Sequence, residues 1–250
     1  MTPRDWDAAT YERLSAPITA MGTEVLDRLV LRGDETVLDA GCGPGNVTRT
    51  LHERLPRGRV IAVDAAPSMV ARARAALGER ADVRQMQLTE LRLEQQVDAV
   101  FSNAVFHWVG DHDALFERLH TVLKPGGRLV AQCGGAGNVE RFHDLAREVG
   151  AEEPFAAHLS GWPGPWNFAT AEQTVERLRR AGFAEVACSL EPWPVRPPEP
   201  LAYLRTVCLG HHMERLPAEL QGPFVERVCA RAEQPLELDY VRLNIGARRP

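Results

Sequence analysis

Paired cysteines are missing from this sequence. Its five cysteines stand far apart between residues 42 and 229, and no two have the C-x-x-C spacing of a zinc knuckle or a redox dithiol. An odd number of widely spaced cysteines is typical of reduced thiols in a cytosolic protein. We therefore expect neither a disulfide framework nor a structural zinc site.

Long apolar runs and an excess of basic residues are also lacking. No apolar stretch approaches the about 18 residues that span a bilayer, and the N-terminal residues lack the apolar core of a signal peptide. The formal net charge is -5, with acids and bases interspersed, which disfavours DNA or RNA as a partner. We expect a soluble cytoplasmic protein that binds a small molecule and no membrane. A monomer and a homodimer both fit this sequence.

The first half of the chain alternates short apolar segments with helical patterns. A helical stretch, broken near Pro17 and Gly22, covers 10–31. Buried strands are then expected at 35–40, 59–64, 82–87, 97–102 and 128–133, with helices at 45–55, 67–77 and 113–123. Strands that alternate with helices form right-handed βαβ units, which give a mostly parallel sheet with helices on both faces. The expected fold class is therefore α/β, with a doubly wound sheet.

The second half of the chain changes character. Its pattern predicts helices at 138–149 and 171–181, an irregular surface loop at 151–168, a strand at 184–193, a helical region at 201–232 broken around Pro217, and a final strand at 236–247. Two strands that flank a helical region indicate an insertion built onto one sheet. We expect one domain over 1–250, with an N-terminal lid at 1–30 and cap elements at about 151–169 and 197–235.

A glycine-rich loop follows the first expected strand. Residues 39–45 read Asp-Ala-Gly-Cys-Gly-Pro-Gly, and glycines permit positive φ and let a ligand lie against bare backbone. A ligand at the carboxyl end of a parallel strand also meets the N–H groups of the next helix. Simple tight turns contain the same kind of cluster. Asn46 stands where the dinucleotide fingerprint G-x-G-x-x-G has its third glycine, which disfavours a nicotinamide dinucleotide.

Asp64 ends the second expected strand. A carboxylate at this position is suited to accept two hydrogen bonds from ribose hydroxyls, a role shared by NAD and S-adenosylmethionine sites. The same carboxylate is also suited to cap the helix expected at 67–77. The loop and the acid together indicate a ligand that carries a ribose.

Four segments resemble, in order and spacing, the class I S-adenosylmethionine-dependent methyltransferases: VLDAGCGPGN, VIAVDAAPSM, FSNAVFHWV and LKPGGRLV. The chain is most similar to the trans-aconitate methyltransferase group, whose members carry N-A-x-x-x-W after the fourth strand, here at 103–108. The resemblance covers residues 5–135 well and the final strand more loosely. It implies a Rossmann-like sheet of seven strands with an antiparallel last strand, and S-adenosylmethionine as the methyl donor.

The resemblance also implies which residues bind the cofactor. Asp39 would orient the methionine amino group, and Asp64 would hold the ribose hydroxyls. Gln87 would accept a hydrogen bond from the adenine amino group, in place of the family's usual acid. The further positions are Gly41, Cys42 and Gly43 along the methionine and ribose, Ala65, Met69 and Leu88 beside the adenine, and Asn103 and Ala104 against the methionine part.

Acceptor contacts are expected after the fourth strand and in the aromatic segments. His107 is the candidate catalytic residue, as a base or as a donor to a substrate carboxylate, although a histidine that only packs in its loop has the same pattern. Trp108, Tyr11 and Trp166 are candidate substrate-binding residues, with ordinary packing as the alternative. Arg205 and Arg242 are suited to pair with an acidic substrate, as are many other arginines of the chain, and the sequence does not distinguish among them.

Residues 107–113 include two histidines and two aspartates, which superficially resemble metal ligands. An acid at the start of a helix serves as its cap and is favoured there by the helix dipole. We therefore interpret Asp111 or Asp113 as the cap of the helix at 113–123 and expect no metal.

These expectations describe a methyltransferase that acts on an oxygen of a small, fairly apolar acceptor. The acceptor is either an acid, as in trans-aconitate methylation, or a hydroxyl of a natural-product-like molecule. The aromatic residues at 151–168 favour an apolar body over a tricarboxylate. The alternatives are a C- or N-methyltransferase of secondary metabolism and a non-catalytic S-adenosylmethionine-binding subunit. A nucleotide-linked oxidoreductase is disfavoured by Asn46 and by the N-A-x-x-x-W segment.

Overall fold

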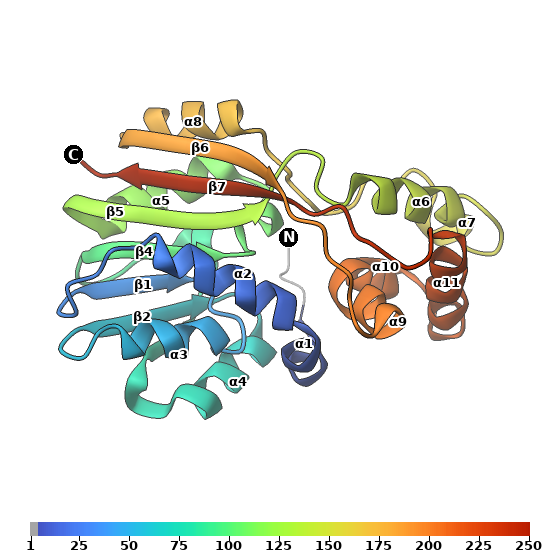
Figure 1. The fold of residues 1–250 in the computed structure, drawn as a ribbon, viewed down its shortest axis with the longest axis horizontal. Coiled ribbons are helices and arrows are strands. Elements are labelled where there is room, and N and C mark those ends of the chain that lie inside the picture. The colour runs from blue at the N-terminus through green and yellow to red at the C-terminus, as the bar shows by residue number, and fades with distance from the viewer. Residues whose placement is uncertain (1–4) are drawn as a thin grey trace.

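Seven strands form one sheet in the larger part of the molecule (Figure 1). The computed structural model describes residues 5–250. The strands are β1 (Thr36–Ala40), β2 (Arg59–Asp64), β3 (Asp82–Gln85), β4 (Val97–Asn103), β5 (Leu123–Gly134), β6 (Ala184–Pro192) and β7 (Val241–Arg248). Their order is β3-β2-β1-β4-β5-β7-β6, and β7 runs antiparallel to both β5 and β6. The expected α/β class, the doubly wound sheet and the antiparallel last strand are confirmed.

Helices cover both faces of the sheet (Figure 1). The helices α2 (Ala16–Asp27), α3 (Asn46–Glu53) and α4 (Pro67–Leu77) pack on one face, and α5 (His112–Val122) and α8 (Ala171–Arg180) pack on the other. The interior strand β1 is apolar on both sides, because Val37, Leu38 and Ala40 are all fully buried. A parallel strand needs this composition when helices cover both of its faces.

The N-terminal helical stretch divides into two helices. One residue separates α1 (Ala8–Leu14) from α2, and Pro17 lies in the first turn of α2, where a proline removes no helical hydrogen bond. The expected break at Gly22 was wrong. Gly22 is buried within α2, where a Cβ would lie 2.8 Å from both Asn103 Nδ2 and Val47 Cγ2. This glycine therefore allows close packing of α2 and does not mark a turn.

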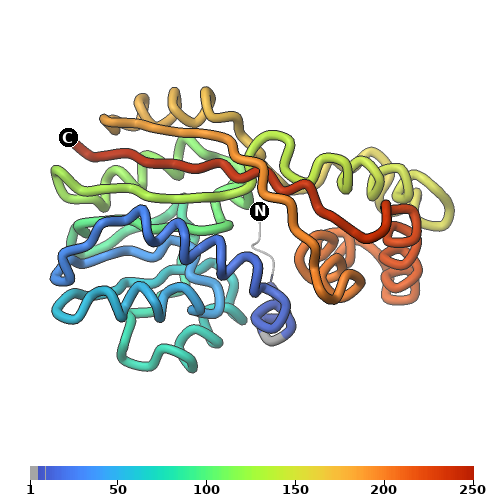
Figure 2. The backbone as a smooth tube through the Cα atoms, viewed as in Figure 1, coloured from blue at the N-terminus to red at the C-terminus, as the bar shows by residue number. Residues whose placement is uncertain are grey.

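A second, helical lobe, which we call the cap, extends from the sheet. It contains α6 (Glu140–Gly150), α7 (Ala156–Leu159), α9 (Pro200–Tyr203), a π-helical turn (Leu204–Cys208), α10 (Gly210–Arg215) and α11 (Ala218–Arg231). The chain enters and leaves the cap next to β5, β6 and β7 (Figure 2). The cap helices share a hydrophobic core of their own. A helical insertion lies between the last two strands as expected, over α9 to α11, with its break at Pro217 between α10 and α11. The expected cap elements did not include α6, which lies between β5 and β6 and packs in the same core.

Two expectations for this half were wrong in detail. The segment at 151–168 is not irregular throughout, because it contains α7 and because Phe155 is fully buried, with its ring 5.2 Å from that of Phe224. The last strand begins at Val241 and not at residue 236. Before it, Leu238 pairs with Val195 in an isolated bridge and packs in the cap core. The apolar alternation at 236–240 thus reflects burial in the cap.

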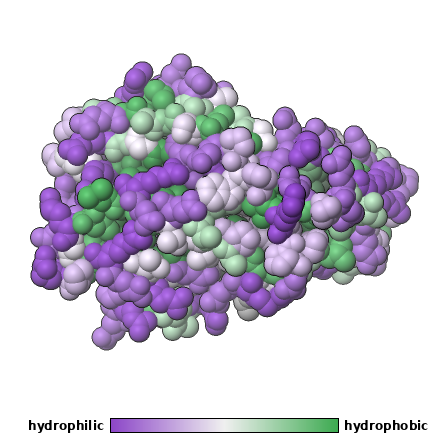
Figure 3. Space-filling model, in the orientation of Figure 1, coloured by the Kyte–Doolittle hydropathy of each residue, from purple (hydrophilic) through white to green (hydrophobic). Residues whose placement is uncertain are grey.

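The surface shown in Figure 3 is mostly hydrophilic, with hydrophobic residues gathered in a few patches. Val30, Leu190 and Leu201 are the exposed large apolar side chains among the described residues, and they lie on separate segments of the chain. No helix within residues 5–250 combines the length and the apolar character that crossing a membrane requires.

Candidate active site

A cavity of about 460 Å³ lies between the sheet and the cap, at the carboxyl ends of β1, β2 and β4. Residues of α1 and of the segment at 165–168 also line it. A smaller cavity of about 60 Å³ adjoins it and shares Tyr11, Gly41 and Asn103 with it. The strand order reverses between β1 and β4, and open α/β sheets bind their ligands at such a switch point.

The loop after β1 is shaped by its glycines. Gly41, Gly43 and Gly45 have φ values of 92°, 54° and 93°, which residues with a side chain rarely adopt. At Gly41 a Cβ would lie 2.2 Å from Cγ2 of Val105, so a larger residue does not fit. Two N–H groups of the loop donate to one carbonyl of β2, at 2.7 and 3.0 Å. The loop therefore presents bare backbone to the cavity and is held there by β2.

Asp64 at the end of β2 joins this loop to the start of α4. Its two carboxylate oxygens accept hydrogen bonds from the backbone N–H groups of Gly43 and Ala66, both at 2.9 Å. Burial raises the pKa of Asp64, and these backbone hydrogen bonds oppose that rise. A carboxylate has about four lone-pair sites, so acceptor capacity remains where Asp64 lines the cavity.

Asp39 lies in the wall of the smaller cavity. It is 2% exposed and accepts a hydrogen bond of 2.7 Å from the hydroxyl of Thr48. Desolvation raises the pKa of Asp39 to about 7; the Thr48 hydrogen bond opposes this rise and the charge of Asp64 adds to it. Cys42 lines the same cavity, and burial raises the pKa of its thiol, which therefore stays protonated. Near neutral pH the Asp39 carboxyl is thus close to its titration midpoint.

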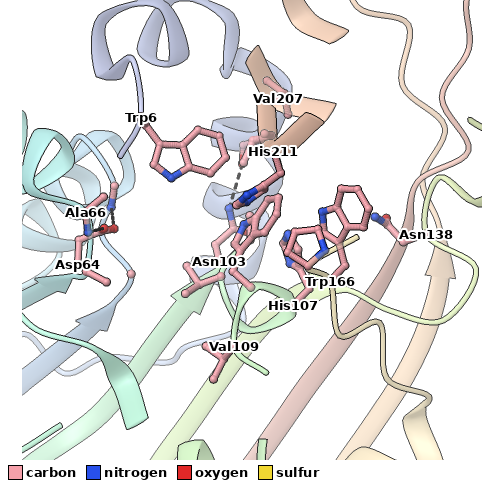
Figure 4. Close-up of a pocket in the computed structure, with 18 of the residues that line it drawn as sticks. Trp6, Asp64, Ala66, Asn103, His107, Val109, Asn138, Trp166, Val207 and His211 are labelled. Carbon is pink, nitrogen blue, oxygen red and sulfur yellow. Dashed lines mark hydrogen bonds between the residues drawn. The ribbon is translucent and has the colours of Figure 1, made fainter. Parts of the chain in front are cut away.

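Asn103 at the end of β4 lines both cavities. Its Nδ2 donates to the carbonyl of Ile18 in α2 at 3.1 Å (Figure 4), and its Oδ1 is buried without a hydrogen-bond partner among the described residues. A buried amide oxygen without a donor is costly, so a ligand that donates a hydrogen bond there would be stabilised. The next residue, Ala104, has a φ of 60° and lines the larger cavity.

Four more residues of the expected cofactor site come together beside β2 and β3. Ala65, Met69, Gln87 and Leu88 all line the larger cavity. Met69 and Leu88 are buried, and Gln87 is partly exposed. An apolar slot with an amide at its end suits a flat heterocycle that carries an N–H donor. Every residue that the sequence predicts as a cofactor contact therefore lines one of the two cavities.

His107 lies in the short 3-10 turn Phe106–Trp108 after β4, and it is buried. Its Nδ1 accepts a hydrogen bond of 3.2 Å from the backbone N–H of Gly134. A neutral imidazole whose Nδ1 accepts carries its proton on Nε2. Burial lowers the pKa of His107 well below its usual range, and the positive charge of Arg242 acts in the same direction. The ring at the cavity wall is therefore neutral, with an N–H donor at Nε2.

Arg242 in β7 is the only arginine or lysine among the described residues that line the larger cavity. It is 2% exposed, and its Nε donates to Oε1 of Gln132 at 3.2 Å. Its Nη2 is buried and has no hydrogen-bond partner within residues 5–250. Arg205, in contrast, is exposed, donates to Gln221 Oε1 at 2.9 Å and does not line the cavity. Of these two arginines, the structure brings only Arg242 to the cavity.

Aromatic rings cover the cavity from several segments. Tyr11, Trp108 and Trp166, which the sequence predicts as substrate contacts, all line it. Trp6 and His143 line it as well, although the sequence pattern does not single them out. The ring of Trp6 lies 5.6 Å from that of Trp108, and the ring of His143 lies 4.1 Å from that of Trp166. His143 is four residues after Val139, which also lines the cavity, and residues at this spacing share one face of a helix. This spacing is the sequence signal that could have predicted His143 as a lining residue.

The two sides of the cavity differ in chemistry (Figure 4). Asp64 lies on one side, His107 and Trp166 lie on the other, and Asn103 lies between them. Arg242 belongs to the His107 side, since its charge lowers the pKa of that histidine. The cavity therefore has an acidic side near β2 and a cationic, aromatic side near the cap.

Residues 107–113 make local contacts. Asp111 caps α5 by accepting a hydrogen bond of 2.9 Å from the N–H of Ala114, which confirms one of the two expected caps. His112 is buried, and its Nε2 lies 2.9 Å from the carbonyl oxygen of Phe106. In the part of the chain that the structure describes, no three histidine, cysteine or acidic side chains are grouped to hold a metal ion.

Residues 37–127 match the family model of the methyltransferase domain. The chain is 33% identical to trans-aconitate 2-methyltransferase of Methylobacterium nodulans, over 98% of each chain. It is 32% identical to trans-aconitate 2-methyltransferase of Variovorax paradoxus, over 96% of this chain and 94% of that one. Its fold is similar to that of phospholethanolamine N-methyltransferase 2 of Haemonchus contortus in complex with phosphomonomethylethanolamine and S-adenosylhomocysteine. That likeness has a TM-score of 0.65 and 18% identity, and covers 97% of this chain and 57% of that chain.

Proposed function

The chain belongs to the class I S-adenosylmethionine-dependent methyltransferases, within the trans-aconitate methyltransferase group, and we propose that it methylates a carboxylate oxygen of a small organic acid. Its cofactor is S-adenosylmethionine. The observation that carries the proposal is the buried guanidinium of Arg242, which lines the larger cavity and whose Nη2 has no hydrogen-bond partner among residues 5–250.

The cavity residues fit the cofactor. The unpartnered Oδ1 of Asn103 would accept a hydrogen bond from the methionine ammonium, and Asp39 would add a negative charge nearby. Asp64 would accept hydrogen bonds from the ribose hydroxyls, and Gly41 keeps the loop open where a side chain would clash. When bound, the cofactor supplies an electrophilic methyl group on a sulfonium. The protein supplies position and charge.

A buried guanidinium is stabilised by a nearby anion. Leaving a desolvated cation without a counter-charge costs several kcal/mol, so a cation kept at a cavity wall indicates that the ligand provides the negative charge. Arginine donates two parallel hydrogen bonds to one carboxylate. Because Gln132 holds Nε of Arg242, the guanidinium plane is fixed before the acid binds.

His107 supports the same function as a hydrogen-bond donor. Its Nδ1 is engaged by Gly134, so its Nε2–H can donate to a carboxylate oxygen but does not remove a proton. A carboxylate has no proton to lose and needs no base. With the carboxylate held by Arg242 and His107, one of its oxygens would be placed in line with the methyl group of the bound cofactor; transfer would give a methyl ester, with the C–S electron pair left on the sulfur of S-adenosylhomocysteine.

The proposal is tested with Arg242→Met and the matched exposed variant Arg205→Met. Removing one partner of a buried charge pair costs about 2–5 kcal/mol, so Arg242→Met should lower kcat/KM for acid acceptors by at least about 30-fold. Its affinity for S-adenosylhomocysteine, measured by calorimetry, should stay near that of the wild type. Arg205→Met should change neither quantity. Ester formation by Arg242→Met at the wild-type rate would refute the proposal.

A hydroxyl acceptor is the second candidate, and it is favoured by one observation. His211 lines the cavity, and its Nδ1 lies 3.3 Å from the carboxylate of Glu214. A histidine paired in this way is suited to take a proton from a hydroxyl. This candidate predicts an ether product that resists mild alkali, and loss of turnover in His211→Asn. An alkali-labile ester formed at an undiminished rate by His211→Asn favours the carboxylate instead.

A further inference from the structure

We propose that the acceptor is a monocarboxylate with a flat, apolar body, held between Arg242 and the aromatic wall of the cavity, and that a tricarboxylate is a poor substrate. The inference rests on the proposed esterification and adds which acid is esterified. It departs from the substrate named for the relatives in Methylobacterium nodulans and Variovorax paradoxus.

The charges in the cavity match one carboxylate. Its described lining residues include one arginine and no lysine. Two lining histidines stay neutral, because burial lowers the pKa of His107 well below its usual range and that of His143 to about 4. The third, His211, already faces the carboxylate of Glu214, which balances any positive charge on it. A second or third carboxylate on the ligand would therefore be buried without a counter-charge.

Four rings on the same side of the cavity are close to parallel. The planes of Trp166 and Phe168 differ by 8°, and that of His143 differs from them by 22° and 16°. His107 stacks on Phe168 at 5.7 Å, with planes 29° apart. All four line the cavity. Parallel ring faces favour a further flat π-system in offset stacking, whereas a puckered ring makes fewer contacts with them.

The cavity volume favours a small acceptor body. At about 460 Å³ it lies in the lower half of the range of about 300–1,000 Å³ that is typical of ligand sites. The cofactor occupies part of this space. The space that remains therefore favours a body of one or two rings over a long chain or a fused polycycle.

The experiment compares three acids on protein saturated with S-adenosylhomocysteine, by calorimetry at pH 7.5. trans-Cinnamate is flat with one carboxylate, 3-cyclohexylpropanoate is puckered with one, and trans-aconitate carries three. We expect trans-cinnamate to bind about tenfold tighter than 3-cyclohexylpropanoate and about 100-fold tighter than trans-aconitate. If trans-cinnamate and 3-cyclohexylpropanoate bind with equal affinity, the inference that the acceptor has a flat body is refuted. Binding of trans-aconitate as tight as that of trans-cinnamate, or no binding of any acid, overturns the inference.

Two tryptophan variants test the aromatic wall. Trp166→Leu should weaken trans-cinnamate about tenfold and change 3-cyclohexylpropanoate by less than about twofold, since only the flat acid gains from the ring face. Trp193 packs against the cap core and does not line the cavity, so Trp193→Leu should change neither. Equal losses for both acids in Trp166→Leu would contradict the stacking.

Failure of the inference can be told apart from failure of the proposed function. If trans-aconitate is esterified in an Arg242-dependent manner and trans-cinnamate is not, the proposed function stands and the inference fails. If trans-cinnamate binds equally well to Arg242→Met, the proposed function fails as well, because the buried cation then has no part in acid recognition.

Discussion

Cofactor affinity should rise with pH up to about 8, and Asp39→Asn should remove the part of this dependence that Asp39 causes. The Asp39 carboxyl is buried, and desolvation raises its pKa to about 7. A protonated Asp39 offers no charge to the methionine ammonium, so the apparent Kd scales as one plus the ratio of protonated to ionised carboxyl. Relative to the Kd of the protein with Asp39 fully ionised, the Kd is about 11 times higher at pH 6 and about 1.1 times higher at pH 8. The two binding free energies differ by about 1.4 kcal/mol.

The measurement is calorimetric titration of S-adenosylhomocysteine between pH 5.5 and 8.5, in buffers of different ionisation enthalpy. Binding at pH 6 should release about 0.9 proton, because ionised Asp39 is the form selected. Thr48→Val should shift the dependence to higher pH, since the Thr48 hydrogen bond lowers the pKa of Asp39. Asp64 also lines the cavity, and its pKa is also raised. Any pH dependence of the Kd that remains in Asp39→Asn is therefore assigned to Asp64. A flat profile in the wild type, with no proton release, would refute the reasoning.

The same carboxyl should affect stability with the opposite sign. Its folded pKa of about 7 lies above its ordinary value of 3.8, so the folded protein binds this proton more tightly than the unfolded chain. The free energy of unfolding of the cofactor-free protein should therefore fall as the pH rises from 4 to 7. Asp39→Asn should remove that part of the slope in urea unfolding, and an unchanged slope would contradict the raised pKa.

Three further predictions concern backbone contacts and a buried acid. Gly41→Ala places a Cβ 2.2 Å from Val105, so S-adenosylhomocysteine binding should be lost in calorimetry; near-normal affinity would contradict the fit. Gly22→Ala places a Cβ 2.8 Å from Asn103, so the melting temperature should fall by about 2–8 °C. Glu35 accepts three backbone N–H bonds, so Glu35→Gln should lower the free energy of unfolding at pH 7 by about 1–3 kcal/mol. Since its folded pKa is about 2, below its ordinary 4.5, this difference should shrink as the pH falls from 4.5 towards 2, and a constant difference would argue against the shift.

The sheet and the cofactor side follow from local sequence patterns. A strand buried on both faces needs an apolar run such as that at 36–40, and the loop after it needs glycines where φ is positive. Asp64 and Asn103 stand at strand ends, and parallel strands bring their carboxyl ends to one edge. Each of these signals lies within a few residues of the group that it predicts.

The acceptor side depends on contacts between distant segments. Alternation in β7 places Leu243 and Ile245 on the core face of the sheet and Arg242 on the opposite face. From this pattern alone we would predict an exposed arginine. Arg242 is buried instead, and Tyr203 of α9 and Tyr11 of α1 lie near enough to affect its pKa, which no pattern in β7 encodes. Phe155 is similar, because its neighbours at 151–168 are typical of a loop, and its burial comes from Phe224 in α11.

The proposed cofactor contacts and the aromatic lining of the cavity come from different parts of the chain. The proposed cofactor contacts all lie before residue 105, whereas much of the aromatic lining of the cavity comes from 139–168 and 207–240, outside the parallel strands. Insertions and substitutions in the cap can therefore change the part of the cavity that would bind the acceptor and leave the proposed site of the methyl donor unchanged. Arg242 lies in β7 and not in a cap helix, so the proposed carboxylate contact would be kept when the cap changes.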